Sequence, residues 1–358
     1  MRDIWYLVLP LIISALITPV VKQIGYRLDA FAQMNERTVH HGKIVRIGGV
    51  AIYLAFIITM ALYVKTDMAM NGILIGSTIM FIGGLVDDLV NLKPLYKFSF
   101  QVVAAIVLIA SGVTLDVIRL PLGITINMGV VSFIVTFFWI TGITNAVNLI
   151  DGLDGLCGGI SVIILTVIAM LAVIEGRGDV EMIALILVGA TLGFLIYNAH
   201  PASIFMGDCG ALFLGFIISA ISLLGFKSST IMTLALPLLL LALPIIDTLS
   251  AILRRTLKGH KFSEADKSHI HHLLMNKFGH KNTVIIMCIV TALFGLTAYV
   301  YMINKGIGLI SLFVIMLAVD LFIEGSGMIS DKYHPILSIA RRIRRRLHRK
   351  KTVSEGDS

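Results

Sequence analysis

Long apolar runs without a single charged residue constrain this chain more than any other feature of its sequence. Examples are the runs 73–86, 102–113 and 231–246. Across the 358 residues, 57% are hydrophobic and only 14% are charged, whereas soluble domains carry about a quarter of charged residues. A helix needs about 20 mostly apolar residues to cross a bilayer. The sequence therefore predicts an all-α integral membrane protein, with the lipid bilayer as its surroundings.

Segments long enough to span a membrane recur along the chain. The 11 segments are 4–24, 47–64, 72–89, 97–113, 129–147, 156–174, 180–198, 209–225, 231–253, 284–303 and 306–324. Ahead of the first segment Arg2 is offset by Asp3, and no small-residue cleavage motif follows it, so we interpret this segment as a retained span. We expect one membrane domain, residues 1–325, with about 11 transmembrane helices, and a basic tail at 326–358.

The basic residues divide unequally between the two sides of these spans. Of the 29 Lys and Arg residues, 23 fall in the tail and in loops on its side, and 6 fall on the other side. The positive-inside rule therefore predicts that the N-terminus lies outside and the C-terminus in the cytoplasm. The net charge of +8 is thus an orientation signal, and we expect no nucleic acid as a partner.

The predicted external connections are short, with one exception at 114–128. Pro121, Gly123 and the alternating residues Ile124 to Ile126 lie in this connection. Turn-forming residues beside an alternating pattern predict a small external hairpin.

Acidic and amide side chains gather where three spans end at the predicted cytoplasmic face. The first group is Asp87 and Asp88, the second is Asn145, Asn148, Asp151 and Asp154, and the third runs from Asn198 to Asp208. Acidic residues are costly at membrane depth and tend to mark function, and their oxygens suit a hard divalent cation. Helix capping is the alternative for Asn145 and Asp208, and a solvated helix end is the alternative for the aspartate pair.

Within the loop 254–283, residues 254–280 carry five histidines and six Lys and Arg residues. Such side chains form charge-assisted hydrogen bonds to a diphosphate or a sugar, whereas a zinc site is the weaker reading because no nearby Cys accompanies them. Carboxylates, a hard metal, a basic loop and a bilayer together indicate phosphoryl transfer to or from a lipid. The sequence has no GxxxxGK[ST] motif, so ATP hydrolysis by a P-loop is disfavoured.

Four motifs resemble those of the polyprenyl-phosphate N-acetylhexosamine-1-phosphate transferases, within the glycosyltransferase 4 family. They are Gly84-Leu-Val-Asp87-Asp88, the stretch Asn145 to Gly155 (NAVNLIDGLDG), Phe205-Met-Gly-Asp208 and Ser268-His269-Ile-His271-His272. The resemblance covers nearly all of residues 1–325. The histidine motif and the segment Thr38 to Gly49 are similar to the bacterial branch that uses UDP-N-acetylglucosamine, rather than the branch that makes lipid I from UDP-MurNAc-pentapeptide.

This resemblance implies a phosphotransferase for substituted phosphate groups. It would transfer N-acetylglucosamine-1-phosphate from UDP-GlcNAc to undecaprenyl phosphate, giving undecaprenyl-diphosphate-GlcNAc and UMP. Its active site would face the cytoplasm from a bacterial plasma membrane, at the first membrane step of making a cell-envelope polysaccharide or a teichoic acid. Which polymer the product feeds is open, and so is the oligomeric state, a homodimer included.

The resemblance also implies roles for individual residues. Asp208 looks like the principal ligand of Mg²⁺ (or Mn²⁺), and Asn148 like a second ligand or a diphosphate contact. Asp87 resembles the carboxylate that accepts a proton from the polyprenyl phosphate or orients it, with Asp88 as its partner. The implied substrate contacts are Asp151 and Asp154 to the nucleotide, Phe205 to uracil, His269, His271 and His272 to the diphosphate or sugar, Lys43, Arg46 and Lys97 to phosphate, and Asn198.

Three alternatives stay open at this point. The same chemistry could use another UDP-N-acetylhexosamine. An ion-coupled transporter would also place acids near helix ends, and an intramembrane prenyltransferase of the UbiA type also uses aspartate clusters and magnesium. Release of UMP from a UDP-sugar, dependent on polyprenyl phosphate, separates these classes.

Overall fold

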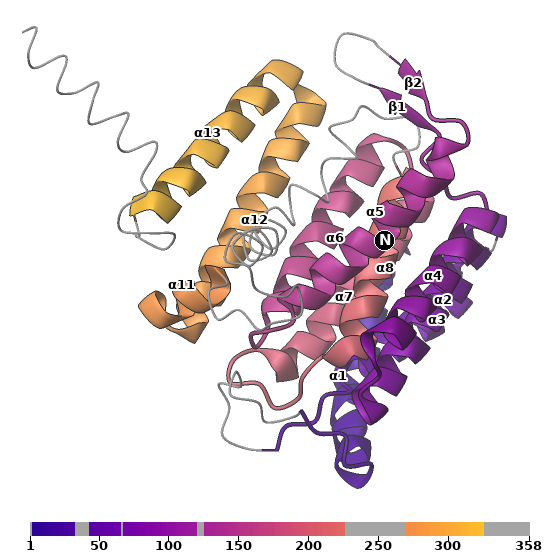
Figure 1. Cartoon of the computed structure of the whole chain (residues 1–358), viewed down its shortest axis with the longest axis vertical. Helices are drawn as coiled ribbons and strands as arrows, with labels where there is room; N and C mark the ends of the chain where they lie inside the picture. Colours follow the sequence, from indigo (N-terminus) through magenta and orange to yellow (C-terminus); the bar gives the residue numbers. More distant parts are fainter. Residues whose placement is uncertain (1, 33–42, 66, 120–124, 226–269, 326–358) are drawn as a thin grey trace, which may run out of the picture.

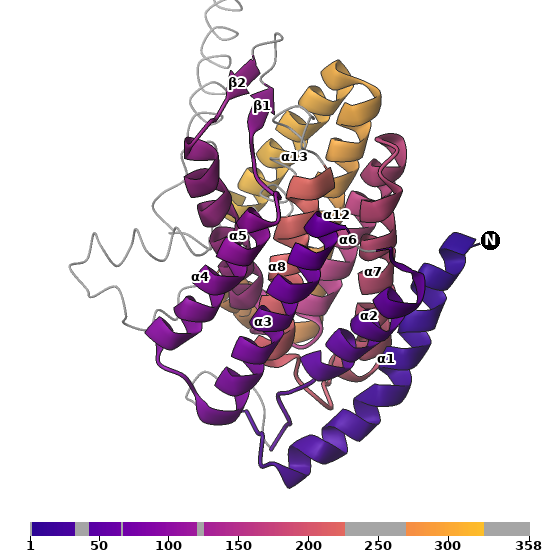
Figure 2. The same cartoon turned by 90° about the vertical axis from the view of Figure 1, so that its right-hand side faces the viewer.

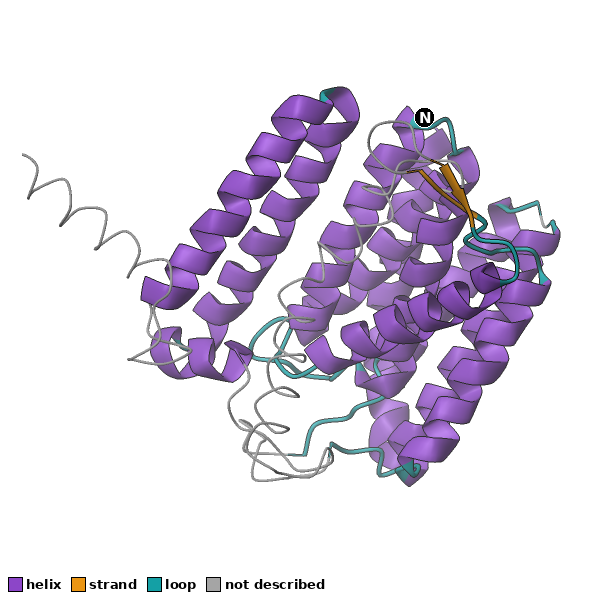
Figure 3. Ribbon diagram, turned by 45° about the horizontal axis from the view of Figure 1, so that its top comes forward, coloured by secondary structure: helices purple, strands orange, loops and turns teal. Residues whose placement is uncertain are grey.

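A computed structural model describes residues 2–32, 43–65, 67–119, 125–225 and 270–325. These residues form a helical bundle with one small hairpin (Figures 1 and 3). The helices are α1 (Arg2–Arg27), α2 (Gly49–Tyr63), α3 (Met68–Val90), α4 (Pro94–Ala110), α5 (Val131–Ile150), α6 (Leu156–Ile174), α7 (Gly178–Asn198), α8 (Gly207–Gly225), α11 (Ile270–Phe278), α12 (His280–Ile303) and α13 (Lys305–Gly325). The strands are β1 (Val117–Arg119) and β2 (Thr125–Asn127).

The described helices match the predicted spans closely. Seven of them, α1, α3, α5, α6, α7, α8 and α12, are long and apolar enough to cross a membrane, and α2, α4 and α13 contain shorter apolar stretches. Ten of the 11 predicted spans therefore coincide with a described helix, while the ninth, 231–253, lies outside the described residues. The architecture is that of a multi-pass membrane protein, whereas the exact number of crossings and their orientation stay predictions.

Helix α8 lies at the centre of the bundle, where it packs against α3, α5 and α2. In its most apolar stretch 89% of the residues are buried, compared with 22% in α1, which runs along the outside of α2 and α7 (Figure 2). The ring of Tyr53 in α2 stacks on Phe81 in α3, with centroids 3.8 Å apart, and meets Phe213 in α8 edge-on at 5.5 Å. Close packing of this kind holds helices together in lipid, and here it fixes α3 relative to α8.

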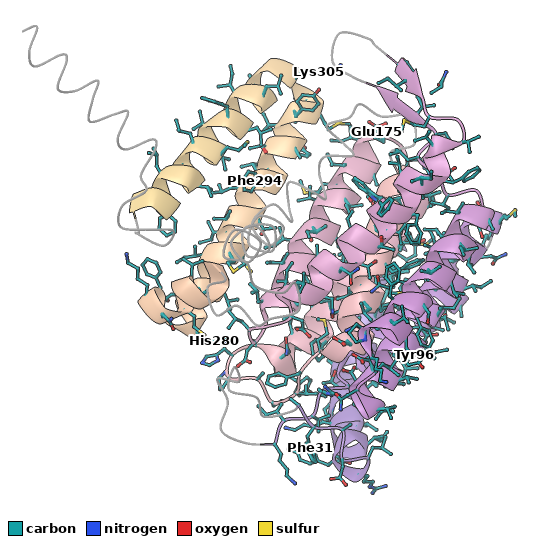
Figure 4. All side chains as sticks on the ribbon, viewed as in Figure 1. Phe31, Tyr96, Glu175, His280, Phe294 and Lys305 are labelled. Carbon is teal, nitrogen blue, oxygen red and sulfur yellow. The ribbon has the colours of Figure 1, made fainter. Side chains whose placement is uncertain are left out.

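The connections between helices separate to the two ends of the bundle. Phe31, Tyr96 and His280 lie at one end, and Glu175 and Lys305 lie at the other (Figure 4). The first three belong to connections predicted to be cytoplasmic, and the other two to connections predicted to be external. The structure thus keeps the two predicted sets apart, and the assignment of either end to the cytoplasm stays a prediction.

The hairpin predicted at 114–128 is confirmed. β1 and β2 pair in antiparallel fashion, with Val117 opposite Asn127. The carboxylate of Asp116 accepts hydrogen bonds from the hydroxyls of Thr114 and Ser132, at 2.8 and 3.0 Å. These bonds tie the hairpin to the start of α5.

Candidate active site

The predicted site residues lie where the ends of four helices meet. α3 ends just after Asp87 and Asp88, α4 begins close to Lys97, α5 ends just after Asn148, and α8 begins at Gly207, next to Asp208. Hydrogen bonds join residues as far as 121 positions apart in the sequence at this place. The structure therefore brings together three of the groups that the sequence placed at helix ends.

Lys97 links carboxylates that belong to two different helices. Its Nζ lies 3.3 Å from Oδ2 of Asp87 and also contacts Oδ2 of Asp208. Oδ1 of Asp87 accepts a 2.7 Å hydrogen bond from the backbone amide of Leu92. The side chains of Lys97 and Asp208 are 20% and 26% exposed, so both can be reached by a ligand. An ammonium group in this position is a point charge suited to phosphate.

Asp88 has a different environment from Asp87, although the two residues are adjacent. Its two carboxylate oxygens accept hydrogen bonds from the backbone amides of Asp208 and Cys209, at 3.0 and 2.9 Å. These amides belong to the first turn of α8, whose N–H groups have no partner within the helix. Asp88 thus caps α8 from outside that helix, and its side chain is only 3% exposed. Asp208 itself lies inside the first turn and is not the N-cap.

Two glycines allow this close approach of α3 to the start of α8. A Cβ atom on Gly84 would collide with the carbonyl group of Asp208. Gly207 has φ +72°, and a Cβ atom there would collide with the carbonyl oxygen of Arg46 and approach Oδ2 of Asp88. Only glycine meets both demands at Gly207, because it tolerates positive φ and has no side chain.

Arg46 holds the other side of this junction, at the C-terminal end of α3. Its guanidinium group donates hydrogen bonds to the carbonyl oxygens of Asp88 and Asp87, at 2.8 and 3.2 Å, and to the side chain of Asn91. Carbonyl groups at a helix C-terminus lack partners within the helix and carry partial negative charge. Arg46 therefore stabilises the helix end that carries the aspartate pair, and its contact with a phosphate stays a prediction.

The segment that carries Lys43 and Arg46 is joined to the segment that precedes α8. The backbone amide of Phe205 donates a 2.8 Å hydrogen bond to the carbonyl oxygen of Val45. Lys43 is exposed, and its Nζ lies 5.3 Å from the centre of the Phe31 ring. Phe205 is half-buried. Backbone pairing thus places Lys43 and Phe205 at the same end of the bundle as the aspartates.

Asn148 and Asp151, at the end of α5, both carry features that suit a cation. Oδ1 of Asn148 is buried and has no hydrogen-bond partner among the described residues. Burial, followed by the negative charges of Asp208 and Asp88, raises the pKa of Asp151 from its ordinary value of 3.8 to about 8, although the amide of Gly207 donates to its carboxylate. A buried oxygen without a partner costs free energy, and so does a carboxylate among carboxylates.

The charge balance of the described residues also fits a divalent cation. Four carboxylates lie close to two basic side chains, which leaves a formal charge of −2 when all are ionised. The carboxylates are those of Asp87, Asp88, Asp151 and Asp208, and the basic side chains are those of Lys97 and Arg46. Asp and Asn oxygens are the ligands that Mg²⁺ prefers. Asp208 and Asn148, the two metal ligands that the resemblance implies, offer a partly exposed carboxylate and a buried amide oxygen.

Asp154 belongs to a second cluster, in which its own side chain is buried and that of His200 is 38% exposed. Its Oδ2 accepts a 3.1 Å hydrogen bond from the amide of Ala202 and lies 2.9 Å from Nδ1 of His200. The backbone amide of Asp154 donates to Nε2 of His280 at 3.2 Å, and the two histidine rings stack with centroids 4.2 Å apart. The side chain of Asp154 is 1% exposed, so in this structure it joins chain segments to one another.

Asn198 plays a similar part beside Asp154. Its Oδ1 accepts a 3.1 Å hydrogen bond from the amide of Gly155, and its Nδ2 donates to the carbonyl oxygen of Ile204 at 2.9 Å. Asn198 is 4% exposed. The amide group predicted to contact substrate therefore fixes the loops on either side of it.

Asn145, for which the sequence offered a cation ligand or a helix cap, forms hydrogen bonds between two helices in this structure. Its Nδ2 donates to Oε1 of Gln101 and to the carbonyl oxygen of Thr141, each at 2.8 Å, and its Oδ1 accepts from Nε2 of Gln101 at 3.0 Å. Both ends of its amide are thus used inside the bundle, between α4 and α5.

The predicted histidine motif lies only partly within the described residues. His269 lies outside them, whereas His271 and His272 belong to α11, which leads through Gly279 into α12. His280, which the sequence placed in an anion-binding loop, is the first residue of α12 and packs on the Asp154 cluster.

Three residues of this region were not among the predicted site residues: Gln101, His200 and His280. A polar residue within an apolar span is a recognisable signal, and it applies to Gln101. No signal in the sequence pairs the two histidines with Asp154, because they meet it across 46 and 126 positions of the sequence.

Comparisons with known proteins identify the family of the chain. Residues 70–226 match the model of glycosyl transferase family 4. A probable undecaprenyl-phosphate N-acetylglucosaminyl 1-phosphate transferase of Bacillus subtilis is 37% identical over 345 residues, covering 95% of this chain and 96% of that protein. A decaprenyl-phosphate N-acetylglucosaminephosphotransferase of Mycobacterium tuberculosis is 32% identical over 315 residues, covering 78% and 76%. A phospho-N-acetylmuramoyl-pentapeptide-transferase of Streptococcus uberis is 30% identical over 250 residues, covering 63% and 74%. The chain belongs to glycosyl transferase family 4.

Proposed function

We propose that this protein transfers N-acetylglucosamine-1-phosphate from UDP-GlcNAc to undecaprenyl phosphate at the cytoplasmic face of a bacterial plasma membrane. The observation that carries the proposal is the contact of Lys97 with both Asp87 and Asp208. The buried oxygen of Asn148, which has no hydrogen-bond partner among the described residues, supports it. This arrangement offers one cation for a phosphate and oxygen ligands for a metal, at the ends of membrane helices. The name and the full-length similarity of the Bacillus subtilis relative support the choice of donor and acceptor.

The reaction forms one phosphorus–oxygen bond and breaks another. An oxygen of the acceptor phosphate attacks the phosphorus that carries the sugar, and the bond from that phosphorus to the bridging oxygen breaks, so that UMP leaves. Both reactants are anions, and their approach requires neutralising charge. A bound Mg²⁺ or Mn²⁺, held by Asp208 and Asn148, would neutralise the diphosphate.

The two adjacent aspartates have different parts in this proposal. Asp87 is 14% exposed, and one of its oxygens lies against Lys97. It can therefore orient that ammonium group toward the acceptor phosphate, and it can accept a proton from the phosphate. Asp88 has both oxygens bonded to the amides that begin α8. We therefore infer that Asp88 positions Asp208, and that Asp87 is the member of the pair that meets substrate.

The nucleotide-sugar must approach from the cytoplasm, so its partners are expected in loops. Asp151, Phe205, Lys43 and the histidines of the motif at 268–272 are the candidates. Asp154 and Asn198 serve the same pocket by holding its loops, because both side chains are buried and bonded within the protein.

A UMP-release assay tests the proposal directly. The purified protein in nanodiscs is expected to release UMP from UDP-GlcNAc only when undecaprenyl phosphate and Mg²⁺ or Mn²⁺ are present. Other UDP-N-acetylhexosamines and UDP-MurNAc-pentapeptide, supplied in the same assay, define the donor. Release that ignores the lipid, or no release with any of these donors, would contradict the proposal.

Orientation has its own test. A reporter fused after Lys351 is expected to report cytoplasm, and one inserted at 175–179 is expected to report the outside. A reporter placed in the segment 199–206 should agree with the one after Lys351. Disagreement between these two would put the site and the tail on opposite faces.

A further inference from the structure

Three stretches of chain that are distant in sequence meet around Asp154. They are the loop after α5, the loop after α7 and the first turn of α12. His200 lies in the second stretch and His280 in the third. Their rings stack on one another, with an angle of 21° between the ring planes. Nε2 of His280 also lies 4.0 Å from Oδ1 of Asp154, and the His280 side chain is 8% exposed. Asp154 and His280 are therefore nearly buried at this contact, which several groups make at once, whereas the His200 ring on its outer side is 38% exposed.

A metal ion is one reading of this cluster, because ligand atoms of Asp154, His200 and His280 all lie within 4.8 Å of one another. An imidazole binds a metal through a lone pair that lies in the plane of its ring. Two rings stacked nearly parallel direct these lone pairs side by side rather than toward one point. The observed hydrogen bonds, from the Asp154 amide to Nε2 of His280 and between Nδ1 of His200 and the Asp154 carboxylate, already occupy one ring nitrogen of each histidine. The geometry favours a hydrogen-bonded stack over a metal site.

The place of His280 in the chain gives this contact a consequence. Only Gly279, with φ +77°, separates α12 from α11, which carries His271 and His272. α12 packs along α6 and α13, and the C-terminal helices α11, α12 and α13 stand at one side of the bundle (Figure 1). His280 lies at the end of α12 that is at the same end of the bundle as Phe31 and Tyr96 (Figure 4). Its bond to Asp154 therefore fixes the start of α12, and with it the direction in which α11 leaves.

We propose that His280 is a positioning residue that docks the histidine-bearing helix α11 against the nucleotide-binding loops by binding the Asp154 loop and stacking on His200. The inference rests on the proposed function, because it assigns α11 to the UDP-sugar. The same contact holds the loop 151–155, so the placement of Asp151 beside Asp208 also depends on it. His280 itself touches neither substrate.

The test is a split between the two substrates in steady-state kinetics. His280→Ala is expected to raise KM for UDP-GlcNAc about tenfold, the effect of losing one hydrogen bond to a functional loop, with KM for undecaprenyl phosphate within about threefold of wild type. His280→Gln keeps an acceptor near the position of Nε2, so it is expected to restore most of the affinity for the donor. Lys281→Ala, at the next and exposed position, is the matched control and should change neither constant.

Each outcome decides for or against the proposal. If His280→Ala does not accumulate as folded protein, His280→Asn, which cannot reach the Asp154 amide, takes its place. Equal effects on both substrates, no effect on the donor, or no rescue by His280→Gln would overturn the positioning role. One equivalent of zinc in the purified wild type, lost in both His200→Ala and His280→Ala, would overturn it in favour of a metal site. A wild type that releases no UMP would instead refute the proposed function, so the two failures are distinguishable.

Discussion

Two clusters at the same end of the molecule use aspartate for opposite purposes. In the carboxylate cluster (Asp87, Asp88, Asp151 and Asp208) negative charge exceeds positive charge, and Asp208 is partly exposed beside Lys97. In the Asp154 cluster (Asp154, His200 and His280) one carboxylate is buried among an amide and two imidazoles. Unbalanced charge leaves capacity for a ligand, whereas a carboxylate bonded within the protein fixes the chain. The comparison separates residues that contact the substrate from residues that position other site residues. Aspartates of one sequence motif can belong to either group.

The largest effect is expected at Asp208, in the carboxylate cluster. Asp208→Asn should lower kcat at least about a thousandfold, because it removes the proposed metal ligand and one of the two carboxylates that hold Lys97. UMP release at saturating substrates measures the loss. Asp179→Asn is the control, since Asp179 pairs with Arg177 elsewhere in the chain, and it should leave kcat within about twofold. Activity retained by Asp208→Asn would remove the basis for placing the metal there.

The aspartate pair itself sharpens the comparison. Asp88→Asn is expected to lower the free energy of unfolding by about 1–3 kcal/mol, because one of the two amides that begin α8 would face an NH₂ group instead of an acceptor. Asp87→Asn keeps an acceptor for the amide of Leu92 and should lose less stability but more activity. Thermal unfolding of both variants in the same detergent shows which one loses more stability, and their kcat values show which one loses more activity. The reverse order would mean that Asp88, and not Asp87, meets the substrate.

The raised pKa of Asp151 predicts how the stability of the protein depends on pH and on a bound cation. Its pKa is raised from 3.8 to about 8 in the folded protein, so the folded state binds more protons than the unfolded state in that range. Without a divalent cation, the stability of the wild type should therefore fall as pH rises from about 4 to 8. Asp151→Asn should weaken this fall and raise the melting temperature in EDTA at pH 8 by at least about 2 °C.

Added Mg²⁺ provides the complementary measurement for Asp151. It should stabilise the wild type more than Asp151→Asn, because the cation relieves repulsion that the variant has already lost. Melting curves of both proteins in EDTA and in Mg²⁺ show the difference. Equal stabilisation of the two would place the cation away from Asp151.

The sequence was informative about the fold and about which helix ends carry the site. Ten predicted spans and the hairpin near 114–128 have counterparts in the structure, because long apolar runs and turn residues act locally. The meeting of Asp87, Asp88 and Asp208 could also be predicted, since alternation of spans puts their helix ends on one face.

The division of roles within the motifs could not be predicted from the sequence. Asp87 and Asp88 point about 100° apart on a helix, and which of them faces α8 depends on the rotation of α3 about its axis. That rotation is set by packing such as the Tyr53–Phe81 stack and by the approach at Gly84. The pairing of His280 with Asp154 likewise depends on tertiary structure. The sequence alone predicts only an anion-binding role for a histidine in a basic loop.

The smallest effect is expected for the amide pair of Gln101 and Asn145, which lies between two membrane helices. It tests whether side chains that are bonded within the protein only fix the chain. Gln101 lies one turn from Lys97 on α4, and Asn145 lies three residues before Asn148 on α5. A satisfied polar pair between membrane helices contributes about 0.6 kcal/mol on average and up to about 1.7 kcal/mol. Gln101→Leu and Asn145→Leu should each destabilise the protein, and the double variant should be more stable than the sum of their effects implies, because neither amide is then left without a partner.

A double-mutant cycle on thermal stability measures this coupling, and kcat of the same variants should stay within about threefold of wild type if the pair only holds α4 to α5. Additive losses would show that the two amides do not stabilise each other. A loss of kcat much larger than the loss of stability would give the pair a different role. The pair would then set the distance between Lys97 and Asn148, and so between the acceptor phosphate and the cation. In that case, hydrogen bonding within the protein would no longer distinguish residues that fix the chain from residues that affect catalysis.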